Sequence, residues 1–68
     1  MIRREISLEC GARQMMEARE ALNALSGVIG AEVVAGRNAI RVWQGDEPGE
    51  EAIGDALRGS GVTAYRIR

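Results

Sequence analysis

The chain has 68 residues, with nine basic residues that are all arginine, ten acidic residues and a formal net charge of −1. A chain of this length forms one domain, residues 1–68, and buries only about 60% of its unfolded surface, so its core is modest. The balanced charge argues against nucleic acid as a main partner, because phosphate binding requires a basic face.

The sequence also limits the expected location of the protein. No apolar run approaches the roughly 20 residues of a membrane span, and Met1 to Glu5 lead directly into strand-like alternation without a signal peptide. The single cysteine cannot form an internal disulfide, which suits a reducing compartment. We therefore expect a cytoplasmic protein, and the frequent Ala, Gly and Arg residues suggest a GC-rich bacterial genome.

The first third of the chain predicts a strand, a tight turn and a helix. Residues 3–10 alternate, so that Ile6, Leu8 and Cys10 share one face. Gly11 permits the turn that follows. An amphipathic helix begins at Ala12 or Arg13, and its apolar stripe consists of Met15, Ala18, Leu22 and Leu25. Gly27 is the expected C′ residue that ends this helix.

The middle of the chain predicts a β-hairpin. A strand over residues 31–35 is followed by the turn signal Gly36-Arg37-Asn38 and a strand over residues 39–43. Within the later strand, alternation directs Ile40 and Val42 inward and Arg41 and Trp43 outward.

The last third predicts a helix and a final strand. A polar loop over residues 44–49 leads into a helix from Pro48 or Gly49 to Arg58, in which Gly54 allows close packing on the sheet. The final strand covers residues 62–67. We expect four arginines near the termini to be solvated edge residues, namely Arg3, Arg4, Arg66 and Arg68.

The predicted order β-α-β-β-α-β defines the fold class. Two crossover units on one sheet give the α+β, ferredoxin-like architecture. We predict a four-stranded antiparallel sheet with strand order 4-1-3-2 and both helices on one face.

Several segments resemble a known family. The run from Ala21 to Val28, ALNALSGV, looks like the helix end and Gly-Val turn of heavy-metal-associated (HMA) domains. Glu32-Val33-Val34 resembles their second strand, and the second helix and its glycine stop are matched by Ile53, Ala56, Leu57 and Ser60-Gly61. That family includes copper chaperones, mercury-binding proteins and the N-terminal modules of metal-pumping ATPases. The resemblance implies a metal-handling domain, a soft metal such as Cu(I) and a metal-transport partner.

The chain departs from the family at the metal ligands. HMA domains bind metal through a Cys-x-x-Cys motif after the first strand, where soft sulfur selects soft metals. Counted back from Gly27, the two cysteines would fall on Gly11 and Gln14, and a one-residue slip would place them at Cys10 and Arg13. The second cysteine is absent in either alignment, so the resemblance implies a degenerate site.

The sulfur-containing residues near this loop have two interpretations each. Cys10 is a small core residue, or a thiolate whose pKa is lowered by the start of the helix and which binds metal together with a second molecule. The thioethers of Met15 and Met16 are candidate ligands for Cu(I). Met15 fits the apolar stripe and is expected in the core, whereas Met16 is less committed to packing.

Three functions follow from these residues, and none is enzymatic, because the chain has no histidine and no nucleophile with a matching base. The leading hypothesis is an HMA-like domain that binds a soft metal weakly through Cys10 shared between molecules. The second is a metal-free interaction or dimerisation module that uses Trp43 and Arg41 on the open sheet face. The third is an ACT-like domain that senses a small ligand near Gly11.

Overall fold

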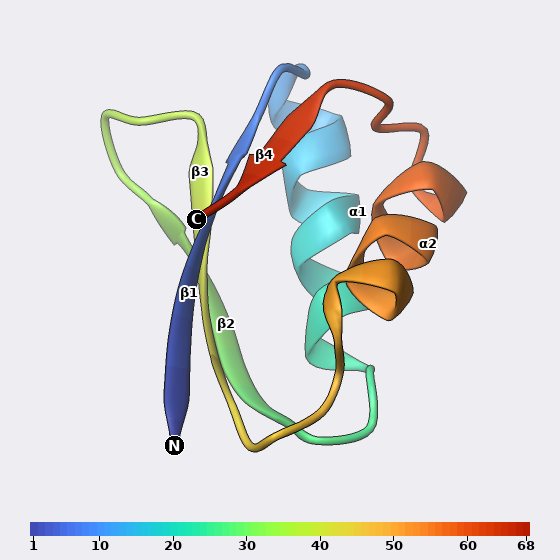
Figure 1. The fold of residues 1–68 in the computed structure, drawn as a ribbon. Coiled ribbons are helices and arrows are strands. Elements are labelled where there is room, and N and C mark those ends of the chain that lie inside the picture. Colours follow the sequence, from blue (N-terminus) through green and yellow to red (C-terminus); the bar gives the residue numbers. More distant parts are fainter.

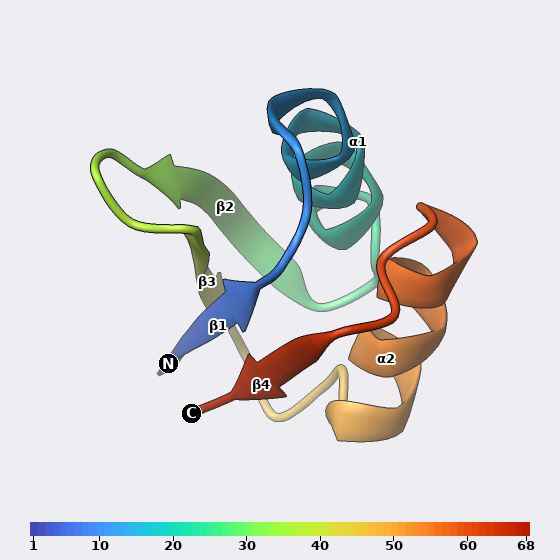
Figure 2. The ribbon, with the colours of Figure 1, turned by 90° about the horizontal axis from the view of Figure 1, so that it is seen from above.

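The computed structural model describes all 68 residues as two layers, a sheet and a pair of helices that cover one of its faces (Figures 1 and 2). The sheet is antiparallel and has the strand order β2-β3-β1-β4, which is the predicted order. Neither helix has the length and apolar character needed to cross a membrane. The elements are β1 (Ile2–Leu8), α1 (Ala12–Asn23), β2 (Val28–Val34), β3 (Ala39–Gln44), α2 (Glu50–Gly59) and β4 (Tyr65–Ile67).

The core lies between the two layers and follows the predicted alternation. On β1 and β3, every second residue points toward the helices, so that Ile6 and Ile40 are paired and fully buried. Met15 is buried on the stripe of α1, as predicted. The cluster consists of Ile6, Leu8, Met15, Ala18, Leu22, Ala31, Ile40, Val42, Ile53, Leu57 and Val62. Burial of this apolar area is the main term that stabilises the fold.

The end of α1 differs from the prediction. The helix stops at Asn23 and its C-cap is Ala24, so Gly27 is not the C′ residue. Gly27 instead has φ +95°, and its carbonyl accepts a hydrogen bond of 3.1 Å from the Gly45 N–H. A Cβ atom at this position would lie 2.2 Å from the carbonyl oxygen of Glu47. Glycine is required here by a turn and by the close approach of a second loop.

The strand boundaries also shift. β1 ends at Leu8, so Cys10 belongs to the following loop and is not the last inward residue of the strand. β2 begins at Val28, three residues earlier than predicted. β4 is only three residues long, because Val62 still bonds to the last turn of α2, where its N–H donates to the Leu57 carbonyl at 2.9 Å.

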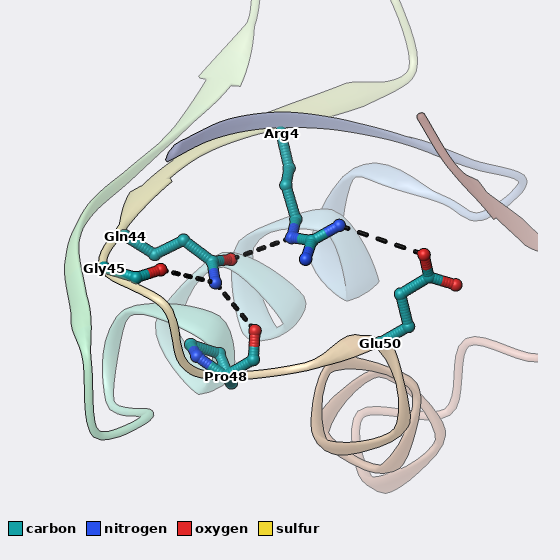
Figure 3. Close-up of polar contacts among 5 residues, drawn as sticks. All are labelled: Arg4, Gln44, Gly45, Pro48 and Glu50. Atoms are coloured by element: carbon teal, nitrogen blue, oxygen red, sulfur yellow. Dashed lines mark hydrogen bonds and ion pairs between the residues drawn. The ribbon is translucent and has the colours of Figure 1, made fainter. Parts of the chain in front are cut away.

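The β3–α2 loop lies at the end of the molecule opposite the β1–α1 loop that contains Cys10 (Figure 1). A buried polar network holds it there (Figure 3). Gln44 is fully buried, and its Nε2 donates to the carbonyl oxygens of Pro48 at 2.7 Å and Gly45 at 3.2 Å. Its Oε1 accepts a 3.1 Å hydrogen bond from Nε of Arg4, whose guanidinium lies 3.9 Å from Glu50. The expectation that Arg4 is a solvated edge residue is therefore wrong: its side chain is half-buried on the helix face of the sheet. The Glu47-Pro48 peptide bond in this loop is cis.

Close packing at Gly54 is confirmed. A Cβ atom on Gly54 would lie 2.5 Å from the hydroxyl oxygen of Tyr65, which comes from β4. The hydroxyl accepts a 3.1 Å hydrogen bond from Arg58, and Arg58 also pairs with Asp55. The absence of a side chain at Gly54 therefore lets the last strand approach α2 closely.

Candidate functional site

Cys10 lies in the loop that joins β1 to α1, immediately before the N-cap residue Gly11. Its side chain packs partly against the core and is half-buried. Partial burial raises the pKa of the Cys10 thiol above its usual value, because removal from water disfavours the thiolate. The direction of this shift is opposite to the lowering expected from the start of the helix, and its cause is desolvation.

A groove of about 370 Å³ opens beside this loop, between the start of α1 and the β2–β3 hairpin. It brings Cys10, Met15 and Met16 together, so all three candidate sulfur side chains line one space. Met15 is buried and belongs to the core, whereas Met16 is 56% exposed. Val33 and the hairpin residue Arg37 line the groove from the other side. The lining is mainly apolar, and its one thiol is that of Cys10.

The sequence did not lead us to expect that the β2–β3 hairpin forms one wall of the groove. The end of β1 is joined to this hairpin by a hydrogen bond of 2.8 Å from the Leu8 N–H to the Asn38 carbonyl. Antiparallel pairing of β1 with β3 places the end of β1 beside the start of β3. The predicted strand order, combined with the turn at residues 36–38, already contained this neighbourhood.

One chain does not provide a complete metal site. No group of three or more Cys, His, Asp or Glu side chains is arranged to hold a metal ion. Arg13, which occupies one of the two alternative positions for the family's second cysteine, is exposed and pairs with Glu17 at 3.8 Å. A single chain therefore offers a soft metal at this loop one thiolate, and a second thiolate would have to come from another molecule.

Arg41 and Trp43 alternate along β3 with the buried residues Ile40 and Val42, so they lie on the uncovered face of the sheet, as predicted, and neither lines the groove. This face is occupied by ion pairs: Glu5 lies 2.8 Å from Arg37 and 3.5 Å from Arg41, and Arg41 lies 3.9 Å from Glu32. Trp43 is half-buried, and its partners in the sheet register are Arg3 on β1 and Gly30 on β2. On this face Glu5 and Glu32 offset the charges of Arg37 and Arg41.

Comparison with known proteins identifies the fold. No protein-family model matches the sequence, and no curated protein matches it significantly. Among solved structures, one described as "Crosstalk between Cu(I) and Zn(II) homeostasis" has a TM-score of 0.84 and 17% identity, and covers 100% of both chains. The yeast copper transporter domain Ccc2a has a TM-score of 0.80 and 16% identity, and covers 97% of this chain and 93% of its own. A copper-binding domain from HMA7, a P-type ATPase, has a TM-score of 0.79 and 21% identity, and covers 98% and 95%.

The chain therefore has the ferredoxin-like fold of copper- and zinc-binding HMA domains over almost its whole length. The likeness predicted from the Gly27-Val28 turn and the second helix is confirmed at the level of the fold. Since a shared fold does not by itself fix function, the chemistry has to be argued from the Cys10 groove.

Proposed function

We propose that this protein is a non-catalytic domain of the heavy-metal handling, chaperone-like class. It binds a soft metal such as Cu(I) weakly, and the metal is held by Cys10 thiolates from two molecules. The observation that carries the proposal is the position of Cys10. The only thiol of the chain lies in the β1–α1 loop, half-exposed, at a groove that it shares with Met15 and Met16.

Sulfur chemistry supports a soft cargo over a hard one. Thiolate and thioether ligands select Cu(I), whereas Mg²⁺ and Ca²⁺ require several oxygen ligands. The groove is lined by three sulfur side chains and mainly apolar neighbours, and no carboxylate lines it. Met16 is the more accessible thioether, and it serves as an additional sulfur ligand for a metal that approaches from solvent.

Weak binding follows from the state of the thiol. Cys10 must lose its proton to bind a metal, and its raised pKa makes that step less favourable near neutral pH. A weakly held cargo passes easily to a partner with more ligands. A metal-transport partner of this kind is consistent with fold neighbours that include a copper transporter domain and a P-type ATPase domain.

The test is a Cu(I) titration against a competing chelator, with size-exclusion chromatography of each sample. We expect one metal per two chains, and the Cys10→Ser variant should lose binding and metal-dependent dimerisation together. The Met16→Leu variant keeps the apolar volume and should weaken binding less than Cys10→Ser. Unchanged Cu(I) affinity in Cys10→Ser would refute the proposal.

Each of the two other functions is supported by one observation. The position of Trp43 and Arg41, two residues apart on the uncovered face of β3, favours a metal-free interaction module, and Trp43→Ala would then reduce association. The groove beside Gly11 favours an ACT-like sensor of a small ligand, which a thermal-shift panel of amino acids would reveal.

A further inference from the structure

The outer edge of β2 is the most apolar free edge of the sheet. β2 pairs only with β3, so its other side has no neighbouring strand. Its two large exposed apolar side chains are Ile29, 69% exposed, and Val33, 38% exposed. The register between β2 and β3 shifts between Val28 and Gly30, so Ile29 is the extra residue of a β-bulge. An exposed apolar edge of this kind is a template for another strand.

One contact shows which backbone groups point to this edge. Nε of Arg19, on α1, donates a 3.1 Å hydrogen bond to the carbonyl oxygen of Ala31. That carbonyl therefore points away from β3, and in an antiparallel sheet the N–H of the same residue points the same way. Alternation directs the N–H and carbonyl of Val33 to the same edge. Of the backbone donors and acceptors that point to this edge, the Ala31 carbonyl is already hydrogen-bonded to Arg19.

We propose that the β2 edge binds the β2 edge of a second copy of this chain in antiparallel orientation, with Ala31 on the two-fold axis. In this register Ile29 of each copy lies opposite Val33 of the partner. The exposed Ile29 then meets the apolar groove that Val33 and Met16 line. Glu32 lies opposite Gly30, so no like charges face each other. A protruding side chain and a groove on one strand thus match each other under two-fold symmetry, which favours a second copy as the occupant.

Arg19 limits the strength of this association. The Ala31 carbonyl already accepts a hydrogen bond from Arg19, which competes with the backbone N–H of the second copy for this oxygen. The dimer therefore gains less than it would at a vacant acceptor, and a weak, concentration-dependent equilibrium is expected. Arg19 thus disfavours pairing of another strand with this edge, as charged side chains at sheet edges do in other proteins.

This dimer is distinct from the metal-shared dimer of the proposed function. With Ala31 on the axis, the two Val33 residues lie four strand positions apart, or about 13 Å along the strand direction. The two grooves, and the Cys10 residues that line them, are therefore at opposite ends of the shared edge. The edge dimer requires neither metal nor Cys10, so the two proposals fail independently.

The experiment is analytical ultracentrifugation across a concentration series, with chelator and reductant present. The wild type and Cys10→Ser are expected to dimerise equally, and Ile29→Glu or Val33→Glu to raise the dissociation constant at least about tenfold, the equivalent of 1.4 kcal/mol. Ile2→Glu is the matched control, because Ile2 and Val33 are each 38% exposed. Arg19→Ala, which frees the Ala31 carbonyl in both copies, should tighten the dimer by about 5- to 160-fold, the worth of two ordinary hydrogen bonds.

A second readout locates the interface. Amide hydrogen exchange at Ala31 and Val33 should slow with rising protein concentration in the wild type and not in Ile29→Glu. A protein that remains monomeric up to roughly 1 mM, a concentration that would reveal even a millimolar dissociation constant, would overturn the proposal. So would a dimer that Ile29→Glu and Val33→Glu leave intact, or one that Cys10→Ser abolishes.

Discussion

The two ends of the molecule are built differently. At the end that holds the β3–α2 loop, Gln44 is fully buried and all of its polar atoms have partners, while Gly27 and Glu47 bring two loops into contact. At the opposite end, Cys10 is half-buried beside an open groove. A buried, satisfied network rigidifies one arrangement of the chain. A groove with partly exposed sulfur leaves room for a ligand. Buried polar contacts therefore hold the β3–α2 end in one arrangement, whereas the Cys10 end presents a partly exposed sulfur beside an open groove.

The largest effect is expected for Gly27→Ala. The added Cβ would lie 2.2 Å from the Glu47 carbonyl oxygen, and φ is +95°. A positive φ costs an L-residue about 1–2 kcal/mol and overpacking a further 1–3 kcal/mol, so a loss of about 3 kcal/mol in unfolding free energy is expected.

The control for this change is Gly36→Ala in the β2–β3 hairpin. Gly36 has φ +78°, but an added Cβ meets nothing within 4 Å. Only the conformational cost of about 1–2 kcal/mol is therefore expected. Urea denaturation of both variants measures the difference, and equal losses would mean that contact between the two loops contributes little.

A smaller loss is expected for Gln44→Ala. Removal of the amide leaves the buried Pro48 carbonyl without its partner and takes from the Arg4 guanidinium one of its two partners, the other being Glu50. An unsatisfied buried polar group costs about 1–3 kcal/mol. Gln14→Ala is the matched control, because Gln14 also donates to a backbone carbonyl, that of Gly61, but at an exposed position. We expect a change within about 0.5 kcal/mol for the control. Similar losses in the two variants would contradict the proposed asymmetry between the ends.

The sequence predicted the parts of this comparison that depend on periodicity. Alternation on β1 and β3 and the stripe of α1 gave the core, including Met15, because burial of apolar faces determines both patterns. The strand order followed from the order of elements and the handedness of crossovers. The uncovered position of Trp43 followed in the same way.

Pairs of distant residues could not be predicted in this manner. Gln44 continues the inward alternation of Ile40 and Val42, yet a polar side chain is buried only if partners are present, and those come from Arg4 and Pro48. Gly27 was expected to end α1 as its C′ residue, which is wrong; glycine is required at this position by the carbonyl of Glu47, twenty residues later in the sequence. The thiol pKa of Cys10 depended on how far tertiary packing covers it, which the position of the helix start alone does not reveal.

The smallest expected effect tests the Cys10 end. Burial raises the folded-state pKa of the Cys10 thiol above that of the unfolded chain, which is about 8.5. The folded protein therefore holds the proton more tightly. The resulting stability is fully present below the unfolded pKa and is lost as pH rises through the folded pKa. The rate of alkylation by iodoacetamide against pH should have a higher midpoint in the native protein than in the same protein in urea, and Cys10→Ser should lose the matching decline of stability. A midpoint in the native protein below that in urea would mean that the helix N-terminus lowers the pKa of the Cys10 thiol by more than burial raises it. Cys10 would then be an activated thiolate with strong metal affinity, and the proposal of weak, shared binding would have to be replaced.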